Sequence, residues 1–457
     1  MPRLSSLALA AFTAVANGVA LQPRETPGPI INFANNTGTP KHLASGILYG
    51  LPDNQTQIPS ALLSGFGFNY GRAAGAQVGH GWSWSQPEFE VGHLFKSALS
   101  NYQLTRSHNG GFVLLLNDLW GFDTTQNSSS LAPGDNGDWS SYDRFLARLV
   151  QLINSNNMKA GLVIDIWNEP EGSAFWNRSI DQWLAMWGRG QAFGTNSVLL
   201  SGPTTAGQPS LSYNWWYEWA SFVSSNASVP DQYVWHEEAG TGSSLSKSYN
   251  GLTQIQAKYK LPKKQININE YAIYNEEVPA GSAFWISQLE RINAIGLRGN
   301  WLGGTKLHDF AASLLSKPDQ NNYAATGYFT NGDYQVYKYY SQNMTGSRYG
   351  TSVSPDGIMD AYTTVDCGHV RCLMGVRPPA TGTYSVTFNN LSSLGLRTSG
   401  SISVRTWKFP VASDVHFGRV DAPIDLGTLS HSYSNNQLVL PYYSTDNVTT
   451  YAWEWQV

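Results

Sequence analysis

The chain has 457 residues, which is enough for one large barrel and a smaller second domain. Aromatic residues make up 13% of the chain and charged residues 13%, against about 25% charged residues in an average globular protein, and this composition excludes a disordered chain. The formal net charge is only -4, so the sequence lacks the basic surface that nucleic acid binding requires.

The first twenty residues have the pattern of a secretory signal peptide. Arg3 precedes an apolar stretch over 4–16 that ends in small residues, and cleavage is expected between Ala16 and Ala20. This stretch is shorter than the roughly 20 residues that span a membrane, so we expect a secreted, soluble protein with no membrane partner. Eight Asn-x-Ser/Thr sequons fit a glycosylated secretory route. They are at Asn35, Asn54, Asn127, Asn177, Asn226, Asn343, Asn390 and Asn447.

Short apolar runs alternate with amphipathic stretches in the central part of the chain, which predicts repeated strand and helix units with a parallel sheet. The eight candidate strands are 45–51, 67–73, 112–116, 162–167, 197–201, 232–235, 265–269 and 297–301. Segments 142–153 and 284–295 have the apolar spacing of helices. Eight parallel strands close a barrel, so the predicted fold class is α/β, with a (β/α)8 TIM barrel over residues 21–345.

The composition changes after an aromatic helical stretch over 333–344. Gly, Ser, Thr and Asn become frequent, and runs of alternating or β-branched residues occur at 383–388, 402–407 and 437–440. Residues 346–457 are therefore predicted to form an antiparallel β-sandwich domain. Residues 26–40 precede the barrel and could add a strand to this sandwich.

The chain has two cysteines, Cys367 and Cys372, which lie five positions apart. They could face each other across a tight hairpin, and because a secreted protein folds in an oxidising compartment, we expect a disulfide between them. The chain entropy of so short a loop corresponds to about 2 kcal/mol, so the bridge would fix one turn only. A zinc site needs more ligands than two cysteines offer, and we expect no metal and no cofactor.

Two predicted strands end in a glutamate. One apolar run leads into Asn168-Glu169-Pro170, and a second, over 265–269, leads into Glu270. In a parallel barrel the C-terminal ends of the strands converge on one mouth, so the two carboxyl groups are expected to meet there. Two carboxyl groups across a sugar-sized cleft are what glycosidic cleavage requires, one as proton donor and one as anion. The sequence thus favours a carbohydrate substrate.

The roles of the two glutamates follow from electrostatics. If Glu270 is ionised, its charge should raise the pKa of Glu169 and keep that residue protonated. Strict alternation directs Glu169 into the barrel, but it groups Glu270 with Ile266 and Ile268, on the opposite face from the barrel interior. The seventh barrel strand must therefore twist or end before Glu270.

Trp167-Asn168-Glu169-Pro170, the following Phe175-Trp176 and the strand-ending Glu270 resemble the clan A glycoside hydrolases. The chain is most similar to glycoside hydrolase family 39, the family of β-xylosidases and α-L-iduronidases, over nearly all of its mature length. The resemblance implies a retaining glycosidase in which Glu169 is the acid/base and Glu270 the nucleophile. It also implies that Asn168 binds a sugar 2-hydroxyl and that Trp301 stacks against the substrate.

Further candidate substrate-binding residues lie near the predicted strand ends. Arg72 stands where the family usually carries a His-Gly sequence, and His236 is followed by Glu238 where the family has an aromatic residue. Glu237 and Glu238 could bind an unusual sugar, take the role of the nucleophile, or be solvated. Glu276 and Glu277 are further rivals of Glu270 for the role of nucleophile. The remaining candidates are Asp118, Trp120 and Tyr271.

The leading hypothesis is a secreted enzyme that acts on xylose-, arabinose- or uronic-type sugars from the chain end of plant polysaccharides. An endo-acting β-glycanase is the nearest alternative. A carbohydrate-binding wall protein that keeps the barrel without turnover is a third, because the fold alone does not establish activity. The sequence leaves the sugar, the linkage and the oligomeric state open.

Overall fold

The computed structural model describes residues 25–75, 82, 91–121, 131–191, 193 and 197–457. The predicted signal peptide and the sequon at Asn127 lie outside these residues, so both stay predictions.

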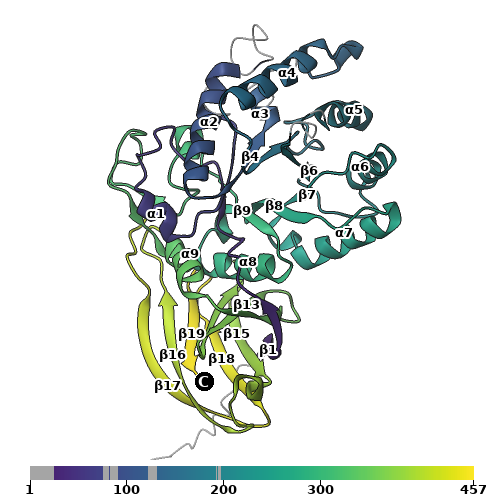
Figure 1. The fold of residues 1–457 in the computed structure, drawn as a ribbon. Helices are drawn as coiled ribbons and strands as arrows, with labels where there is room; N and C mark the ends of the chain where they lie inside the picture. The colour runs from purple at the N-terminus through teal and green to yellow at the C-terminus, as the bar shows by residue number, and fades with distance from the viewer. Residues whose placement is uncertain (1–24, 76–81, 83–90, 122–130, 192, 194–196) are drawn as a thin grey trace, which may run out of the picture.

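Eight parallel strands form a closed barrel, which confirms the predicted TIM barrel (Figure 1). They are β2 (Gly46–Leu48), β3 (Tyr70–Ala73), β4 (Gly111–Leu115), β5 (Leu162–Asp165), β6 (Leu199–Thr205), β7 (Gln232–Glu237), β8 (Gln265–Tyr271) and β9 (Ile295–Arg298). Strands such as β5 are buried along their whole length, because helices cover the outside of the barrel while side chains fill its interior. Each of the eight runs predicted as strands overlaps one of these strands.

The helices that the structure describes lie mainly between the barrel strands. They are α1 (Ser60–Gly65), α2 (Val91–Ser107), α3 (Leu116–Trp120), α4 (Ser140–Ser155), α5 (Ile180–Gly190), α6 (Asn214–Ser225), α7 (Leu245–Tyr259), α8 (Pro279–Arg291) and α9 (Gly332–Asn343). Local signals fix several starts: Ser179 caps α5 by accepting from the Gln182 backbone N–H at 3.2 Å, and Pro279 begins α8. The helix predicted over 284–295 ends earlier, because Ile295 already belongs to β9.

Nine strands form the second sheet, in the order β17-β16-β19-β14-β13-β12-β1-β15-β18. They are β1 (Thr26–Gly38), β12 (Ser347–Ser352), β13 (Met359–Asp366), β14 (His369–Val376), β15 (Gly382–Asn389), β16 (Gly400–Phe409), β17 (Ile424–Tyr433), β18 (Gln437–Ser444) and β19 (Thr450–Gln456). Its two end strands, β17 and β18, contact each other, so the sheet folds over its own apolar core as a sandwich. The sheet is mixed, since β1 runs parallel to β15. A short hairpin of β10 (Leu315–Ser316) and β11 (Phe329–Thr330) precedes α9.

Helix α8 joins the barrel to the β domain, because it packs against β13 and β14 (Figure 1). A buried ion pair spans the same boundary: Nε of Arg377, which follows β14, lies 2.6 Å from Oε1 of Glu276, in the loop after β8. Both side chains are almost fully buried. The β domain is thus anchored to a loop at the C-terminal end of a barrel strand.

The predicted disulfide between Cys367 and Cys372 is not formed, and that prediction was wrong. Cys367 lies in the tight turn between β13 and β14 and is exposed, whereas Cys372 is buried in the sandwich core. In the hairpin register Cys372 pairs with Thr363, so no position of the opposite strand brings Cys367 across from it. Burial raises the pKa of the Cys372 thiol to about 12.

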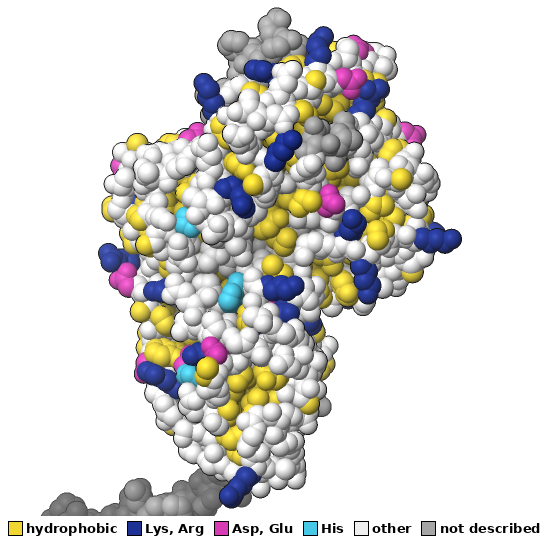
Figure 2. Space-filling model, viewed as in Figure 1, with side chains coloured by type: hydrophobic (Ala, Val, Ile, Leu, Met, Phe, Trp, Pro, Cys, Tyr) yellow, Lys and Arg dark blue, Asp and Glu magenta, His cyan; other side chains and the backbone are white. Residues whose placement is uncertain are grey.

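Charged side chains of both signs are scattered over the face of the molecule in Figure 2, and hydrophobic side chains gather over both the barrel and the β domain. Among the described residues, no helix is long and apolar enough to cross a membrane. Asn390 is half-buried and donates to Oδ1 of Asn32 at 2.7 Å. The other described sequon asparagines are exposed: Asn35, Asn54, Asn177, Asn226, Asn343 and Asn447.

Candidate active site

Four titratable side chains meet at the C-terminal mouth of the barrel. One side-chain ligand atom of each of Glu169, His236, Glu238 and Glu270 lies within 4.8 Å of the others. Glu169 follows β5, His236 lies at the end of β7 with Glu238 just beyond it, and Glu270 lies at the end of β8. The strands that are expected to present the two glutamates therefore bring both to one point.

A β-bulge turns Glu270 into the site. Val234 of β7 pairs with Asn267 of β8, but His236, two residues on, pairs with Glu270, three residues on. The extra residue in β8 shifts its alternation by one position, so that Glu270 is displaced from the outer face on which strict alternation would put it. The expected irregularity of the seventh barrel strand is thus present, and it takes the form of a bulge.

Backbone hydrogen bonds fix the position of Glu169, which lies four residues after the end of β5. Its φ is 40°, in the left-handed region that few glutamates adopt, and its N–H donates to the Thr204 carbonyl at 2.8 Å. The Glu169 carbonyl accepts from the N–H of Gly172 at 2.8 Å. These bonds fix a residue whose backbone would otherwise be unfavourable, and its side chain stays 20% exposed at the mouth.

Arg72, at the end of β3, lies under the glutamates and is fully buried. Its guanidinium donates to Oε1 of Glu270, to Oδ1 of Asn168 at 2.7 Å and to Oδ2 of Asp165 at 2.9 Å. Burial lowers its pKa, but the charges of Asp165 and Glu270 outweigh that effect and raise it, so the guanidinium stays charged. Arg72 and Asn168, both predicted from the sequence, are therefore part of one network.

Asp165 is the residue of this network to which sequence reasoning gave no role. It accepts from Arg72, from Oγ1 of Thr204 at 2.5 Å and from Nδ2 of Asn269 at 3.0 Å, and it is fully buried. The available signal was an acidic residue inside the apolar run 162–167, since a buried carboxylate needs partners. Asp165 orients Arg72 and lies on the inner side of the cluster.

His236 lies between the two predicted catalytic glutamates. Its Nδ1 is 2.8 Å from Oε1 of Glu169, and its Nε2 is 3.7 Å from Oε1 of Glu270. Burial lowers the pKa of His236, but the negative charges of Glu270 and Glu169 outweigh burial and raise it. The ring is thus held in a position where the protonated imidazolium is favoured.

The pKa of Glu169 is lowered, and the expected upward shift caused by Glu270 was wrong. Burial of the Glu169 carboxyl raises its pKa, but the hydrogen bond and charge of His236 more than compensate. The residue with the strongly raised pKa is Glu238, through burial and then through the negative charges of Glu270 and Glu169. A hydrogen bond between Glu238 and Glu270 raises the pKa of Glu238 further and favours its neutral form.

Trp301 lies beside the cluster and is 46% exposed. Its Nε1 donates to the Ala272 carbonyl at 3.1 Å, which fixes the indole. A side chain at Gly299 would come within 2.8 Å of Oε1 of Glu238 and 3.2 Å of Nε1 of Trp301, so a glycine is what allows the two to approach. An exposed, fixed indole at the mouth has the properties of a stacking platform.

Three predicted substrate-binding residues are not brought to the cluster. Tyr271 is fully buried, and its hydroxyl donates to the Ala44 carbonyl at 2.9 Å, outside the barrel strands. Trp120 packs edge-on against Phe145 in the core beneath α4. Asp118 is buried and accepts from the Tyr49 hydroxyl. Tyr271 faces away from the site because the bulge in β8 turns its neighbour Glu270 inward. Asp118 and Trp120 are buried because the chain turns into α3 directly after β4.

The other glutamates that rivalled Glu270 in the sequence have structural partners. Glu237 accepts from Nε1 of Trp235 at 2.8 Å, on the outer side of β7. Glu276 holds Arg377, and Glu277 lies 3.6 Å from Nη2 of Arg298. Burial raises the pKa of Glu277 to about 8. None of the three belongs to the cluster.

The four-residue cluster also has the donor set of a small divalent-cation site. Positive charge is already supplied there by Arg72, which bonds Glu270, and by the imidazole that lies between the two glutamates. The guanidinium and the imidazole therefore offer positive charge to the carboxylates at this place. The expectation that no metal is required stays a prediction.

Comparison with models of known protein families and with curated proteins gives no match. Solved structures do match over nearly the whole chain. N2152 from Neocallimastix frontalis is 20% identical, with a TM-score of 0.71, over 94% of this chain and 98% of that one. A GH39 enzyme from Xanthomonas axonopodis pv. citri is 12% identical, with a TM-score of 0.57, over 97% and 100%. A monomeric β-xylosidase from Caulobacter crescentus is 12% identical, with a TM-score of 0.53, over 94% and 99%.

These likenesses show the fold. The barrel with its appended β-sandwich is the fold of glycoside hydrolases such as the GH39 enzyme, as the sequence motifs indicated.

Proposed function

We propose that the protein is a secreted retaining glycoside hydrolase, with Glu270 as nucleophile and Glu169 as acid/base. The observation that carries the proposal is the approach of these two carboxyl groups to within 4.8 Å from the ends of nonadjacent strands. Retaining glycosidases hold their carboxyl groups about 5 to 5.5 Å apart, whereas inverting enzymes need roughly 6.5 to 9.5 Å to admit a water molecule. The close approach of the two groups therefore supports the retaining mechanism.

Glu270 is suited to attack because Arg72 donates a hydrogen bond to it and places a positive charge beside it. Attack of a Glu270 oxygen on the anomeric carbon forms a glycosyl ester, while the bond from that carbon to the leaving oxygen breaks. Esterification removes the negative charge of Glu270 from the cluster. In the second step water attacks the same carbon, the ester breaks, and the carboxylate returns.

The proton that Glu169 gives to the leaving oxygen is shared with His236 in the free protein. The hydrogen bond from Nδ1 of His236 to Glu169 holds that proton between two groups, one with a raised and one with a lowered pKa. A sugar oxygen placed at Glu169 then receives the proton through the carboxyl group. In the second step Glu169 takes a proton from the attacking water.

We propose that Glu238 acts as a neutral hydrogen-bond donor to Glu270. A carboxyl group with a strongly raised pKa keeps its proton at neutral pH, and the proton can be directed at the neighbouring carboxylate. This role excludes Glu238 as the nucleophile, because the nucleophile must be an anion. It is also the feature in which this site departs from the aromatic residue that the family usually carries.

For the substrate we propose a xylose-type sugar removed from the end of a plant polysaccharide. The β-xylosidase among the similar structures supports this choice, and so does Trp301, which offers a stacking surface at the mouth. Secretion is supported by the apolar sequence before residue 25 and by the exposed sequon asparagines. Arabinose- and uronic-type sugars are the other substrates that the first screen should include.

A panel of aryl glycosides and plant polysaccharides tests the proposal, with the anomer of the first product followed by NMR. We expect hydrolysis with retention of configuration. Glu270→Gln should abolish turnover, and Glu169→Gln should reduce it about 10²- to 10⁴-fold on substrates with poor leaving groups, the range typical of general acid catalysis. No hydrolysis across the panel would instead support a binding protein, and an inverted product would contradict the proposed mechanism.

A further inference from the structure

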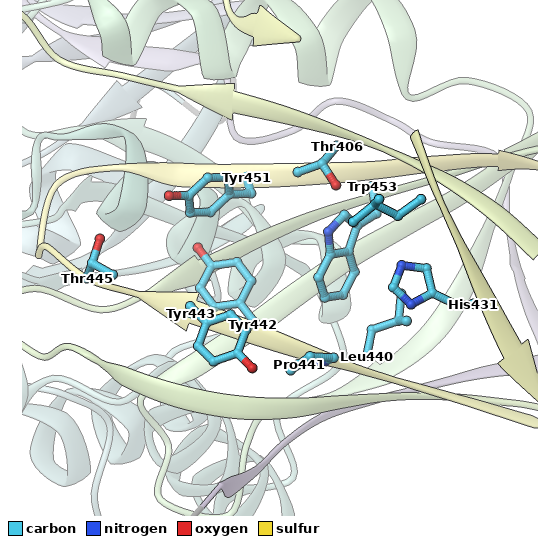
Figure 3. A pocket seen from close by; sticks show the side chains of 10 residues that line it. Thr406, His431, Leu440, Pro441, Tyr442, Tyr443, Thr445, Tyr451 and Trp453 are labelled. Atoms are coloured by element: carbon cyan, nitrogen blue, oxygen red, sulfur yellow. The ribbon is translucent and has the colours of Figure 1, made fainter. Parts of the chain in front are cut away.

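A cleft of about 340 Å³ opens in the β domain, and none of the residues that line it belongs to the cluster at the barrel mouth (Figure 3). It lies where the nine-stranded sheet meets itself, because its walls come from the two end strands β17 and β18 and from β16 and β19. Beyond the bridge between Ser434, which follows β17, and Gln437, which begins β18, the two end strands are not neighbours in the hydrogen-bonded order of the sheet. This leaves a slot in the side of the sandwich.

The cleft is aromatic and uncharged. Trp453, Tyr451 and Tyr443 line it together with His431, and Figure 3 shows the indole of Trp453 between the rings of His431 and Tyr442. None of the residues that line it is Asp, Glu, Lys or Arg. Binding sites for small molecules have this composition, in which aromatic rings give contact area and a few hydroxyl or imidazole groups fix orientation.

The rings are held in place by the core behind them. Tyr442 is 1% exposed and packs edge-on against Tyr451 and Trp453, with ring centroids 5.6 and 6.2 Å apart. At the rim, Tyr443 is 54% and Leu429 69% exposed. A rigid aromatic floor with an exposed apolar rim needs little reorganisation to take a ligand.

We propose that this cleft is a second carbohydrate-binding site, which holds a neutral glycan chain while the barrel cleaves a bond of it elsewhere. The choice of a carbohydrate rests on the proposed glycosidase function. Sugar rings present apolar C–H faces to aromatic rings and hydroxyl groups to polar ones, and the cleft offers both, in Trp453 and Tyr443 and in His431 and Thr406. The absence of charged residues among those that line the cleft favours a neutral chain over a uronic one.

An extended peptide is the rival occupant, since β17 and β18 are sheet edges. Pro441, in the part of β18 that lines the cleft, has no backbone N–H to give to an added strand. The side chains that line the cleft are rings and hydroxyl groups, which suits a sugar face better than a backbone ladder. A second copy of the chain is another possible occupant, and it would form a dimer by covering the exposed rim of Tyr443 and Leu429.

Affinity electrophoresis of the full-length protein in gels that contain xylan, arabinan or no polysaccharide tests the proposal. The two test variants are Tyr443→Ala and His431→Ala, both on the cleft wall. The matched control is Tyr249→Ala on α7, which truncates an exposed tyrosine that does not line the cleft. We expect a neutral polysaccharide to retard the protein, and each cleft variant to weaken that retardation about tenfold in dissociation constant, as for a truncated aromatic anchor. The control should be retarded like the unmodified protein.

Hydrolysis of a small aryl glycoside is measured on the same samples, because it reports on the barrel alone. Unchanged hydrolysis in the cleft variants, with lost retardation, supports the second site and shows that the variants are folded. Retardation without any hydrolysis would overturn the proposed function but leave the cleft site standing. The inference is overturned if no neutral polysaccharide retards the protein, if the cleft variants are retarded like the control, or if Tyr443→Ala instead dissolves a dimer.

Discussion

Nδ1 of His236 lies 2.8 Å from Oε1 of Glu169, which couples a buried imidazole directly to the proposed general acid. Burial lowers the pKa of the imidazole, but the charges of both glutamates outweigh burial and raise it, and the hydrogen bond and charge of His236 in turn lower the pKa of Glu169. The negative charge of Glu270 is therefore not what provides Glu169 with a proton for the leaving group. A proton held jointly by His236 and Glu169 serves the same purpose.

Glu238→Gln should move the alkaline limb of kcat/KM to higher pH. In the unmodified protein, activity falls as pH rises through the raised pKa of Glu238, because ionisation adds a negative charge beside Glu270 and removes a hydrogen-bond donor. Glutamine stays neutral and can still donate, so that loss disappears. An aryl glycoside with a good leaving group is the appropriate substrate, since its cleavage depends little on Glu169.

Glu237→Gln is the matched control for this pH profile, because the neighbouring Glu237 bonds Trp235 and lies outside the cluster. Its alkaline limb should coincide with that of the unmodified protein. An unchanged limb in Glu238→Gln would show that Glu238 does not titrate in the working range.

Arg377→Met should destabilise the whole chain, because it leaves the buried Glu276 carboxylate unpaired at the boundary between barrel and β domain. Loss of one partner of a buried pair typically costs about 3 to 5 kcal/mol in the free energy of unfolding. Denaturant unfolding followed by tryptophan fluorescence measures it. Arg405→Met breaks the exposed pair with Asp425 and should change stability little. Equal effects of the two variants would argue against the role of the Glu276 pair.

Thiol titration of the native protein should show one reactive cysteine. Cys367 is exposed in its turn and Cys372 is buried, so a chromogenic disulfide reagent should modify the first in the native protein and the second only after unfolding. The hydrogen bond and charge of Asp366 raise the pKa of the Cys367 thiol, so the first reaction should quicken as pH rises. A reductant should change neither the count nor the melting temperature. A native protein with no titratable thiol until it is reduced would restore the disulfide expected from the sequence.

Much of the barrel could be predicted from the sequence because each strand is a short apolar run that ends at a polar residue. The two apolar runs that lead to Glu169 and Glu270 are strands of the same parallel barrel, so their C-terminal ends lie at one mouth. The inward turn of Glu270 could not be placed, since a bulge changes pairing without changing composition. The spacing of Cys367 and Cys372 in the sequence likewise does not determine the hairpin register that separates them.

The polar network beneath the glutamates depends on closure of the barrel. Arg72 and Asp165 are 93 positions apart, and only the arrangement of β3, β4 and β5 brings them together. Asp118 and Trp120 are candidates for substrate binding because they follow an apolar run. The chain turns into α3 at that place, and the turn buries both side chains. Sequence identifies strand ends, whereas the direction of the following turn decides which side chains reach the mouth.

Trapping of the glycosyl-enzyme tests the central assignment most directly. The protein is incubated with a 2-deoxy-2-fluoro glycoside of the sugar that the screen identifies, bearing a good leaving group, and the modified peptide is sequenced by mass spectrometry. The account predicts one glycosyl group per chain, in ester linkage to Glu270. A label on Glu238 or Glu169, or steady turnover with no covalent species formed, would contradict it.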